Sequence, residues 1–151
     1  MTVLSTPVPQ GRYVPARRFG DLVFTSGMTP RRDGVLTVAA KIGAAAALED
    51  WKDAVVLAAA NALAAARSAV GEGEDVTAVL NMTVFVAAEP DFTLHTRLAD
   101  FASDYFFEQL GPAGIGSRAA VGVASLPSGS PVEIQLVAGC GQRDANQSLF
   151  G

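Results

Sequence analysis

The chain has 151 residues, half of them hydrophobic, with a formal net charge of −4 and a pI of about 4.8. This length fits one domain with a sizeable core, and the apolar composition excludes a disordered chain. The acidic balance argues against nucleic acid as the main partner, because phosphate binding relies on clustered basic residues. A mean hydropathy of +0.30 is high for a small monomer, so part of the apolar surface is expected between subunits. The one basic cluster is better explained as a solvated rim: Arg12, Arg17, Arg18, Arg31 and Arg32.

The N-terminal and cysteine patterns predict a cytoplasmic protein without a metal or cofactor. The first residues lack the basic region and apolar run of a secretory signal, and no segment reaches the roughly 20 apolar residues of a membrane span. A single cysteine, Cys140, fits a reducing compartment. One Cys and one His are too few for a usual zinc or haem site.

Two short strands are expected first, over residues 12–18 and 22–26, with a tight turn around Gly20. Pro15 favours a sheet edge for the first strand, because proline cannot donate to the ladder. Residues 27–43 are broken by Pro and Gly and are expected to form a loop with at most one short strand.

A helix is expected over residues 49–70, because its apolar residues recur at spacings of three and four. A strand over residues 76–88 follows, with one fully apolar face. Its other face is partly apolar, which favours packing between subunits. The two apolar sets are Leu48, Trp51, Val55, Ala59, Ala62 and Ala66 in the helix, and Val76, Ala78, Leu80, Met82, Val84 and Val86 in the strand.

A second helix is expected over residues 91–110, with Asp91 or Thr93 as its N-cap. Strands over residues 117–124 and 132–138 follow, joined by a hairpin turn. The second helix has the apolar stripe Leu94, Leu98, Phe101 and Tyr105.

The order of these elements predicts an α+β fold, with two helices on one face of a mixed sheet of about six strands. We expect a single domain over residues 1–151, in which residues 1–6 and 140–151 are tails.

Arg118 stands alone in an apolar strand, since no other Lys or Arg lies between Arg97 and Arg143. A guanidinium keeps its charge and is costly to bury unpaired, so it is either paired with an acid or kept to bind an anion. The alternate residues Ala120 and Gly122 are small and leave room for a ligand on its face. A structural arginine that reaches solvent from a strand start is the alternative.

Glu133 points away from the apolar residues of its strand. A strand carboxylate with little charge nearby can have a raised pKa and serve as an acid or base, and a solvent-facing structural Glu is the alternative. The expected hairpin sets Glu133 opposite Gly122, about 13 Å along the strand from Arg118. The two groups would then border one cavity, or a site built across subunits, rather than form a salt bridge.

Three residues of the first hairpin are candidates for ligand binding. Tyr13 and Ser26 offer hydroxyl groups that orient a polar ligand, and Gly27 lets the backbone approach a ligand closely. A plain Ser-Gly turn is the alternative.

Three segments keep a distinctive order and spacing from about residue 7 to residue 138. They are residues 11–27, residues 61–65 with Asp75-Val76, and residues 117–127 with Val132-Glu133-Ile134. Together they resemble the reactive intermediate deaminase (RidA/YjgF) family. The third segment is the most specific, because Arg, its strand, Leu-Pro and the Val-Glu-Ile strand all keep their spacing.

The resemblance implies a chorismate-mutase-like fold and a homotrimer with ligand clefts between subunits. It implies metabolite damage control by cofactor-independent hydrolysis of enamines and imines, such as 2-aminoacrylate, to a 2-keto acid and ammonia. By motif, Arg118 corresponds to the arginine that holds the substrate carboxylate, and Glu133 to the acid that positions or activates water. Tyr13 and Ser26 correspond to hydroxyls of the cleft, beside the substrate-binding positions Gly27 and Ala120. A trimer that binds small carboxylates without turnover is the alternative.

Two positions depart from the best-known deaminases of that family. Met28 replaces the Gln that often follows Ser-Gly, and Ala120 replaces a Cys. The form of the third segment is more similar to a less characterised subgroup, while the retained Arg118 favours a carboxylate ligand.

Overall fold

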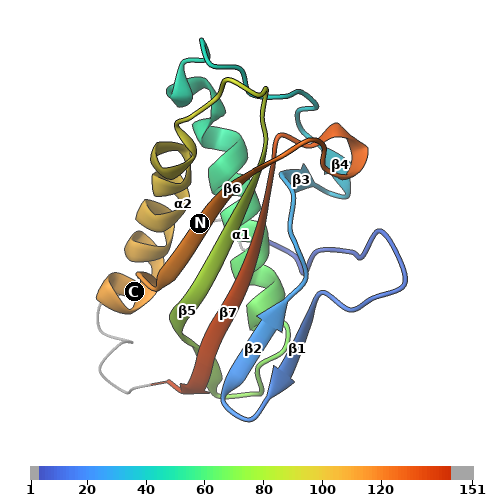
Figure 1. The fold of residues 1–151 in the computed structure, drawn as a ribbon. Coiled ribbons are helices and arrows are strands. Elements are labelled where there is room, and N and C mark those ends of the chain that lie inside the picture. The colour runs from blue at the N-terminus through green and yellow to red at the C-terminus, as the bar shows by residue number, and fades with distance from the viewer. Residues whose placement is uncertain (1–3, 144–151) are drawn as a thin grey trace.

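The computed structural model describes residues 4–143, in which two helices cover one face of a five-stranded mixed sheet (Figure 1). The helices are α1 (Lys52–Arg67) and α2 (His95–Leu110), and the strands are β1 (Ala16–Phe19), β2 (Leu22–Thr25), β5 (Glu74–Ala87), β6 (Ser117–Val123) and β7 (Val132–Gln142). The strand order is β1–β2–β7–β5–β6, with β5 and β6 parallel and the other neighbours antiparallel. This confirms the predicted α+β architecture.

The main sheet has five strands rather than about six, because the segment after β2 folds on itself. Its strands β3 (Arg31–Arg32) and β4 (Val35–Leu36) form a separate two-stranded sheet. The turn between them, Asp33-Gly34, has positive φ at both residues, as a two-residue hairpin turn requires. The prediction of at most one short strand here was therefore wrong.

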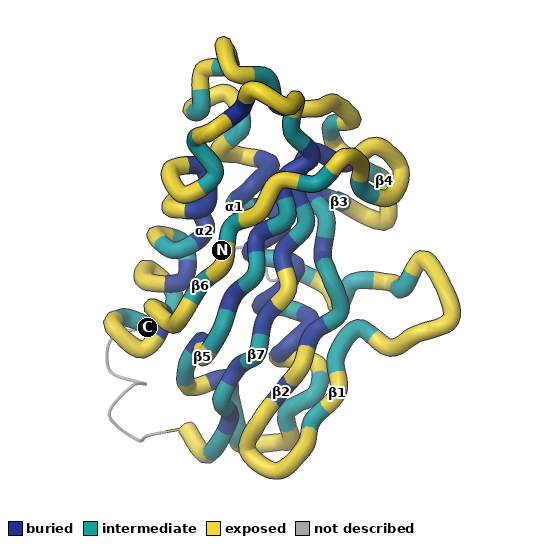
Figure 2. Tube along the Cα trace, in the orientation of Figure 1, coloured by how far each residue is buried: buried dark blue, intermediate teal, exposed yellow. Residues whose placement is uncertain are grey.

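The core lies between the helices and the sheet, along α1, β5 and β7 (Figure 2). Alanines on α1 allow the helix to approach the sheet closely, and four residues of the predicted stripe, Val55, Ala59, Ala62 and Ala66, are fully buried. The other two, Leu48 and Trp51, lie in the turn before α1 and are partly buried. On α2 the buried stripe is Leu98, Ala99, Ala102 and Phe106. The N-cap of α2 is Leu94, without a side-chain hydrogen bond, so neither Asp91 nor Thr93 caps the helix as predicted.

The register of β5 breaks twice, and this changes which side chains reach the core. Irregularities lie between Val76 and Ala78 and between Val79 and Asn81. Val79 is therefore 3% exposed whereas Leu80 is 43% exposed, the reverse of the predicted alternation. A bulge shifts the side-chain order by one residue, which a strict period of two cannot anticipate.

Strands β6 and β7 do not pair, which corrects the predicted hairpin. Strand β5 lies between them: Ala88 donates its N–H to the Val123 carbonyl at 3.4 Å, and Ala87 donates to the Pro131 carbonyl at 2.9 Å. The connection through Ser128 and Gly129, both with positive φ, thus passes across the end of β5. Helix α2 is the crossover that two adjacent parallel strands need.

Strand β7 also extends beyond its predicted end. It runs to Gln142 and buries Cys140, so residues 140–142 belong to the sheet rather than to a tail. Residues 1–3 and 144–151 lie outside the described part. Among residues 4–143, no helix combines the length and apolar character needed to cross a bilayer.

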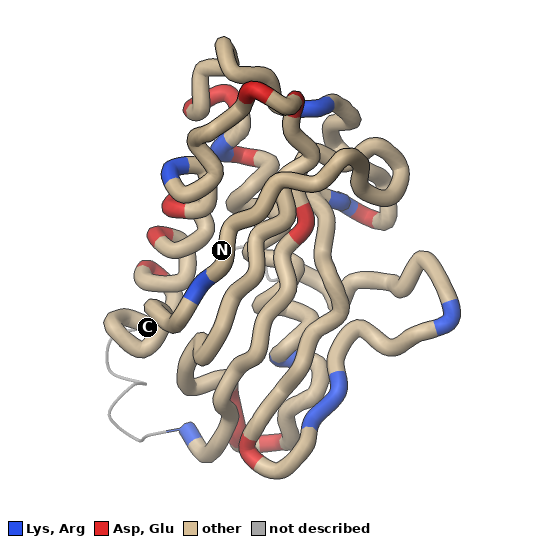
Figure 3. Tube along the Cα trace, viewed as in Figure 1, with Lys and Arg blue, Asp and Glu red and all other residues tan. Residues whose placement is uncertain are grey.

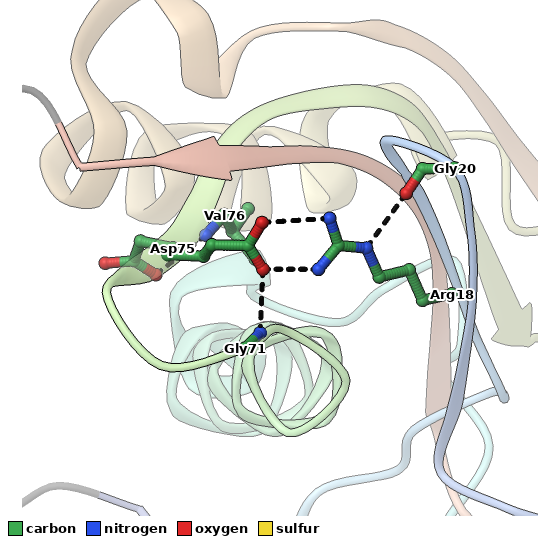
Figure 4. A network of polar contacts seen from close by, with 6 residues as sticks. Arg18, Gly20, Gly71, Asp75 and Val76 are labelled. Carbon is green, nitrogen blue, oxygen red and sulfur yellow. Dashed lines mark hydrogen bonds and ion pairs between the residues drawn. The ribbon is translucent and has the colours of Figure 1, made fainter.

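An ion pair ties the first hairpin to the first residue of β5 (Figure 4). The Arg18 guanidinium donates to both carboxylate oxygens of Glu74, and the Gly71 N–H donates to the same carboxylate at 2.9 Å. These hydrogen bonds, first those from Arg18, lower the pKa of Glu74 to about 2.

Candidate functional site

Glu133 lies on the face of the sheet that the helices leave uncovered. Its neighbours Val132 and Ile134 are fully buried on the helix side, so alternation sends Glu133 to the other face, as predicted. Across the sheet it stands in one row with Phe85 and Val121. Partial burial raises the pKa of its carboxyl above the ordinary value, which makes it a candidate acid or base.

Gly27 lies directly against the Glu133 carboxyl. A Cβ atom on Gly27 would stand 2.6 Å from Glu133 Cδ, closer than side chains tolerate. Backbone hydrogen bonds hold this approach in place, because Met28 and Ile134 exchange N–H···O bonds of 2.8 Å in both directions. The structure therefore brings together two of the predicted site residues, and Met28 belongs to the frame that sets their spacing.

Tyr13 lies in the segment before β1, and Ser26 directly follows β2, the partner strand of β1. The Ser26 hydroxyl donates to the Val14 carbonyl at 2.7 Å, and the Ser26 N–H donates to the Pro15 carbonyl at 2.9 Å. The exposed Tyr13 hydroxyl accepts a bond from the Gln10 N–H at 3.1 Å. Both hydroxyls thus have partners within the first hairpin and its preceding loop.

Arg118 lies on the other face of the sheet, at the edge strand. Its register partner Met82 is buried under the helices, and its guanidinium reaches α2. There Nη1 donates to Asp100 Oδ1 at 2.8 Å and to Ser103 Oγ at 2.9 Å, and Nη2 donates to the Thr96 carbonyl at 3.2 Å. The sequence predicted that Arg118 either pairs with an acid or binds an anion, and within one chain it pairs with an acid.

The small residues beside Arg118 do not leave the room for a ligand that the sequence predicted. Ala120 packs against the core, and a Cβ on Gly122 would meet His95 Nε2 at 2.7 Å. Helix α2 therefore covers this face, and Ala120 does not share a face with Glu133. Within one chain, Arg118 and Glu133 cannot act on the same small molecule, since the sheet separates them.

Charged residues are sparse over the middle of the sheet (Figure 3). Strand β6 carries only Arg118 and β7 only Glu133 as charged residues. Three surface hollows of about 520 to 660 Å³ lie elsewhere, beside Trp51, Glu74 and Asn61, and neither Arg118 nor Glu133 lines them. Within residues 4–143, no three His, Cys, Asp or Glu side chains are grouped to hold a metal ion.

Sequence reasoning missed the partners of Arg118. Thr96, Asp100 and Ser103 recur at intervals of four and three on α2, so their side chains share one polar face of the helix, although Thr96 accepts through its backbone carbonyl. The sequence shows this polar stripe beside the apolar stripe of the same helix. Nothing in the sequence alone joined it to a strand 18 residues beyond Asp100.

Comparisons with known proteins agree with this fold and these motifs. The family model described as Endoribonuclease L-PSP matches residues 3–140. The chain is 31% identical to Protein TCP17 of Trypanosoma cruzi over 130 residues, which cover 85% of this chain and 81% of that protein.

Two solved structures extend the comparison. The protein Atu1372 of Agrobacterium tumefaciens, whose function is described as unknown, is 32% identical with a TM-score of 0.75, over 85% of this chain and 83% of that one. TdcF of E. coli, solved with bound serine, is 26% identical with a TM-score of 0.63, over 94% of each chain. The fold is thus the chorismate-mutase-like fold of these proteins. The chain belongs to the endoribonuclease L-PSP family, which is the RidA/YjgF family that the three sequence segments predicted.

Proposed function

We propose that the protein hydrolyses enamine and imine intermediates of the 2-aminoacrylate type, in clefts between the subunits of a homotrimer. The observation that carries this proposal is the separation of Arg118 and Glu133 on opposite faces of one sheet. A site that uses both residues requires that the edge strand of one copy, which carries Arg118, packs against the sheet face of another copy that carries Glu133. The apolar character of that face supports such contact.

The reaction needs a carboxylate anchor and a group that moves protons. The enamine tautomerises to the imine, water adds to the imine carbon, and the C–N bond breaks to release ammonia and a 2-keto acid. Arg118 binds the substrate carboxylate as a planar, permanently charged donor. Glu133 takes a proton from the attacking water and returns one to the leaving nitrogen, a role suited to a raised pKa.

A coupled assay tests the proposal. A dehydratase or amino-acid oxidase generates the imino acid, and its decay is compared with and without the protein. Glu133→Gln is expected to lower turnover about 100-fold or more while ligand binding persists, because the amide cannot exchange the proton. Arg118→Ala is expected to raise KM about 10- to 100-fold, since a charge-assisted hydrogen bond is lost.

The pH profile provides a second readout of Glu133. Because burial raises the pKa of Glu133, kcat/KM should fall with decreasing pH already above pH 4.5, the ordinary value for Glu. Wild-type turnover that Glu133→Gln leaves unchanged would remove this residue from the mechanism.

A trimer that binds small carboxylates without turnover is the second candidate. The bound serine of TdcF favours it, since serine carries a carboxylate and is not an imine. Binding of serine or a keto acid that Arg118→Ala abolishes, without accelerated decay of any imino acid, would favour this candidate over the deaminase.

Cleavage of RNA, which the family description suggests, has less support in this chain. The net charge is −4, and two of the five N-terminal arginines are engaged within the fold, Arg18 with Glu74 and Arg31 with Gly34 and Ser128. RNA cleavage by the purified protein that is lost in Arg118→Ala would reverse this ranking.

A further inference from the structure

Some of the N–H donors of Arg118 have an acceptor among the described residues, and others do not. A guanidinium has five N–H groups. Asp100 Oδ1 and Ser103 Oγ take both hydrogens of Nη1, and the Thr96 carbonyl takes one hydrogen of Nη2. Within residues 4–143, Nε–H and one N–H of Nη2 have no hydrogen-bond acceptor. Two donors of this kind on adjacent nitrogens match the two oxygens of a carboxylate.

The pair of Arg118 and Asp100 is poorly suited to stabilising the fold. The Asp100 side chain is 57% exposed, whereas that of Arg118 is 20% exposed. Because water solvates the Asp100 carboxylate, the pair stabilises the fold less than a pair of two buried charges would. A neutral hydroxyl and a helix carbonyl complete the set, so the three acceptors fix the plane of the guanidinium rather than surround its charge with acids.

We propose that Asp100 and Ser103 are positioning residues that orient Arg118 for a ligand carboxylate. This inference rests on the proposed function, in which Arg118 anchors the substrate. The acceptors sit on one face of a rigid helix at intervals of three and four residues, and all approach Nη1 or Nη2 from the α2 side. The free N–H groups then need no reorganisation when a carboxylate arrives.

Binding of pyruvate, the keto-acid product of 2-aminoacrylate hydrolysis, tests the proposal. Calorimetry should show about a tenfold weaker Kd for Asp100→Ala and a smaller loss for Ser103→Ala. Asp100→Asn should stay within about threefold of wild type, because its amide oxygen still accepts from Nη1. In turnover the loss should appear in KM and leave kcat nearly unchanged. Asp104→Ala is the matched control, since Asp104 is an exposed carboxylate one helical turn further along.

Several outcomes would overturn the proposal. Tighter or unchanged pyruvate binding in Asp100→Ala would mean that Asp100 competes with the ligand or is irrelevant. Equal weakening in Asp104→Ala would mean that any charge on α2 has this effect.

Nitrogen NMR of arginine-labelled protein separates this proposal from the proposed function. The Nη1 and Nη2 signals of Arg118, assigned by their loss in Arg118→Lys, should be distinct in wild type and averaged in Asp100→Ala. Distinct signals in Asp100→Ala would contradict the positioning role. If wild type neither binds pyruvate nor hydrolyses imines, the proposed function fails, and the NMR pattern still decides whether Asp100 fixes the guanidinium.

Discussion

Gly27 determines where the Glu133 carboxyl lies. A Cβ on Gly27 would meet the end of a flexible side chain and not the backbone, so the fold tolerates Gly27→Ala while the carboxyl moves away. A displacement of about 1 Å can cost about 100-fold in rate. We therefore expect Gly27→Ala to lower kcat/KM for imine hydrolysis by about that factor, with little change in the thermal unfolding midpoint.

A matched substitution and a double mutant make this prediction specific. Gly43 has open space around its missing Cβ and an ordinary φ, so Gly43→Ala should leave activity unchanged. In the Glu133→Gln background, Gly27→Ala should add little further loss, since both changes act on one group. If the losses from Gly27→Ala and Glu133→Gln are additive, Gly27 affects activity independently of the Glu133 carboxyl.

The chemistry of single residues was predicted better than their surroundings. An isolated Arg and a strand Glu are conspicuous because each is costly to bury without a purpose. The face of Glu133 followed from alternation, which holds where β7 is regular. Asp100 lies more than 15 residues from Arg118 in the sequence, and Gly27 lies more than 100 residues from Glu133. Contacts between residues so far apart depend on the order of the strands, which local patterns do not give.

At the scale of elements, strand order was the main failure. The turn at residues 126–129 has the composition of a hairpin turn, and that local pattern suggested β6 beside β7. The parallel crossover through α2 places β6 against β5 instead, and β7 takes the other side of β5. Both arrangements bury the same apolar faces, so periodicity alone does not distinguish them.

The ion pair between Arg18 and Glu74 joins two elements, and its contribution to stability depends on pH. Because the pKa of Glu74 is lowered to about 2 in the folded state, the carboxylate stabilises the fold above its ordinary value of 4.5. That contribution is lost as pH falls from about 4.5 to about 2. Glu74→Gln should therefore lower the unfolding midpoint at pH 7, and its difference from wild type should shrink across that window.

Scanning calorimetry at several pH values and one protein concentration measures this difference. Glu72→Gln, an exposed carboxylate in the turn before β5, is the control and should leave the midpoint unchanged. A constant difference between wild type and Glu74→Gln from pH 7 to pH 2 would show that the lost packing, not the charge, is responsible.

At the scale of the whole molecule, the sheet face opposite the helices has the composition of a buried surface. Phe24 and Val121 are 44% and 41% exposed there, in register with the half-buried Val137 and Phe85. Glu133 lies in the same row as Phe85 and Val121. In the proposed trimer the candidate acid lies within the surface that assembly covers, so we expect its environment and activity to depend on the oligomer.

Val121→Glu tests that dependence. In one chain the substitution changes an exposed side chain on an edge strand, so the fold should persist. Between subunits it buries a carboxylate without a partner, which should weaken assembly about 100-fold or more. Light scattering should then show the 15.5 kDa monomer at micromolar concentration, whereas wild type should show three times that mass.

Activity should fall with the trimer, because the Arg118 edge and the Glu133 face no longer meet. Val35→Glu places the same charge on a valine that is 69% exposed on the separate β3–β4 hairpin, and should change neither mass nor turnover. A wild-type monomer that hydrolyses imines would contradict the shared site outright. A Val121→Glu monomer with full activity would place the whole reaction on the Glu133 face of a single chain, and Arg118 would then have only its structural partners on α2.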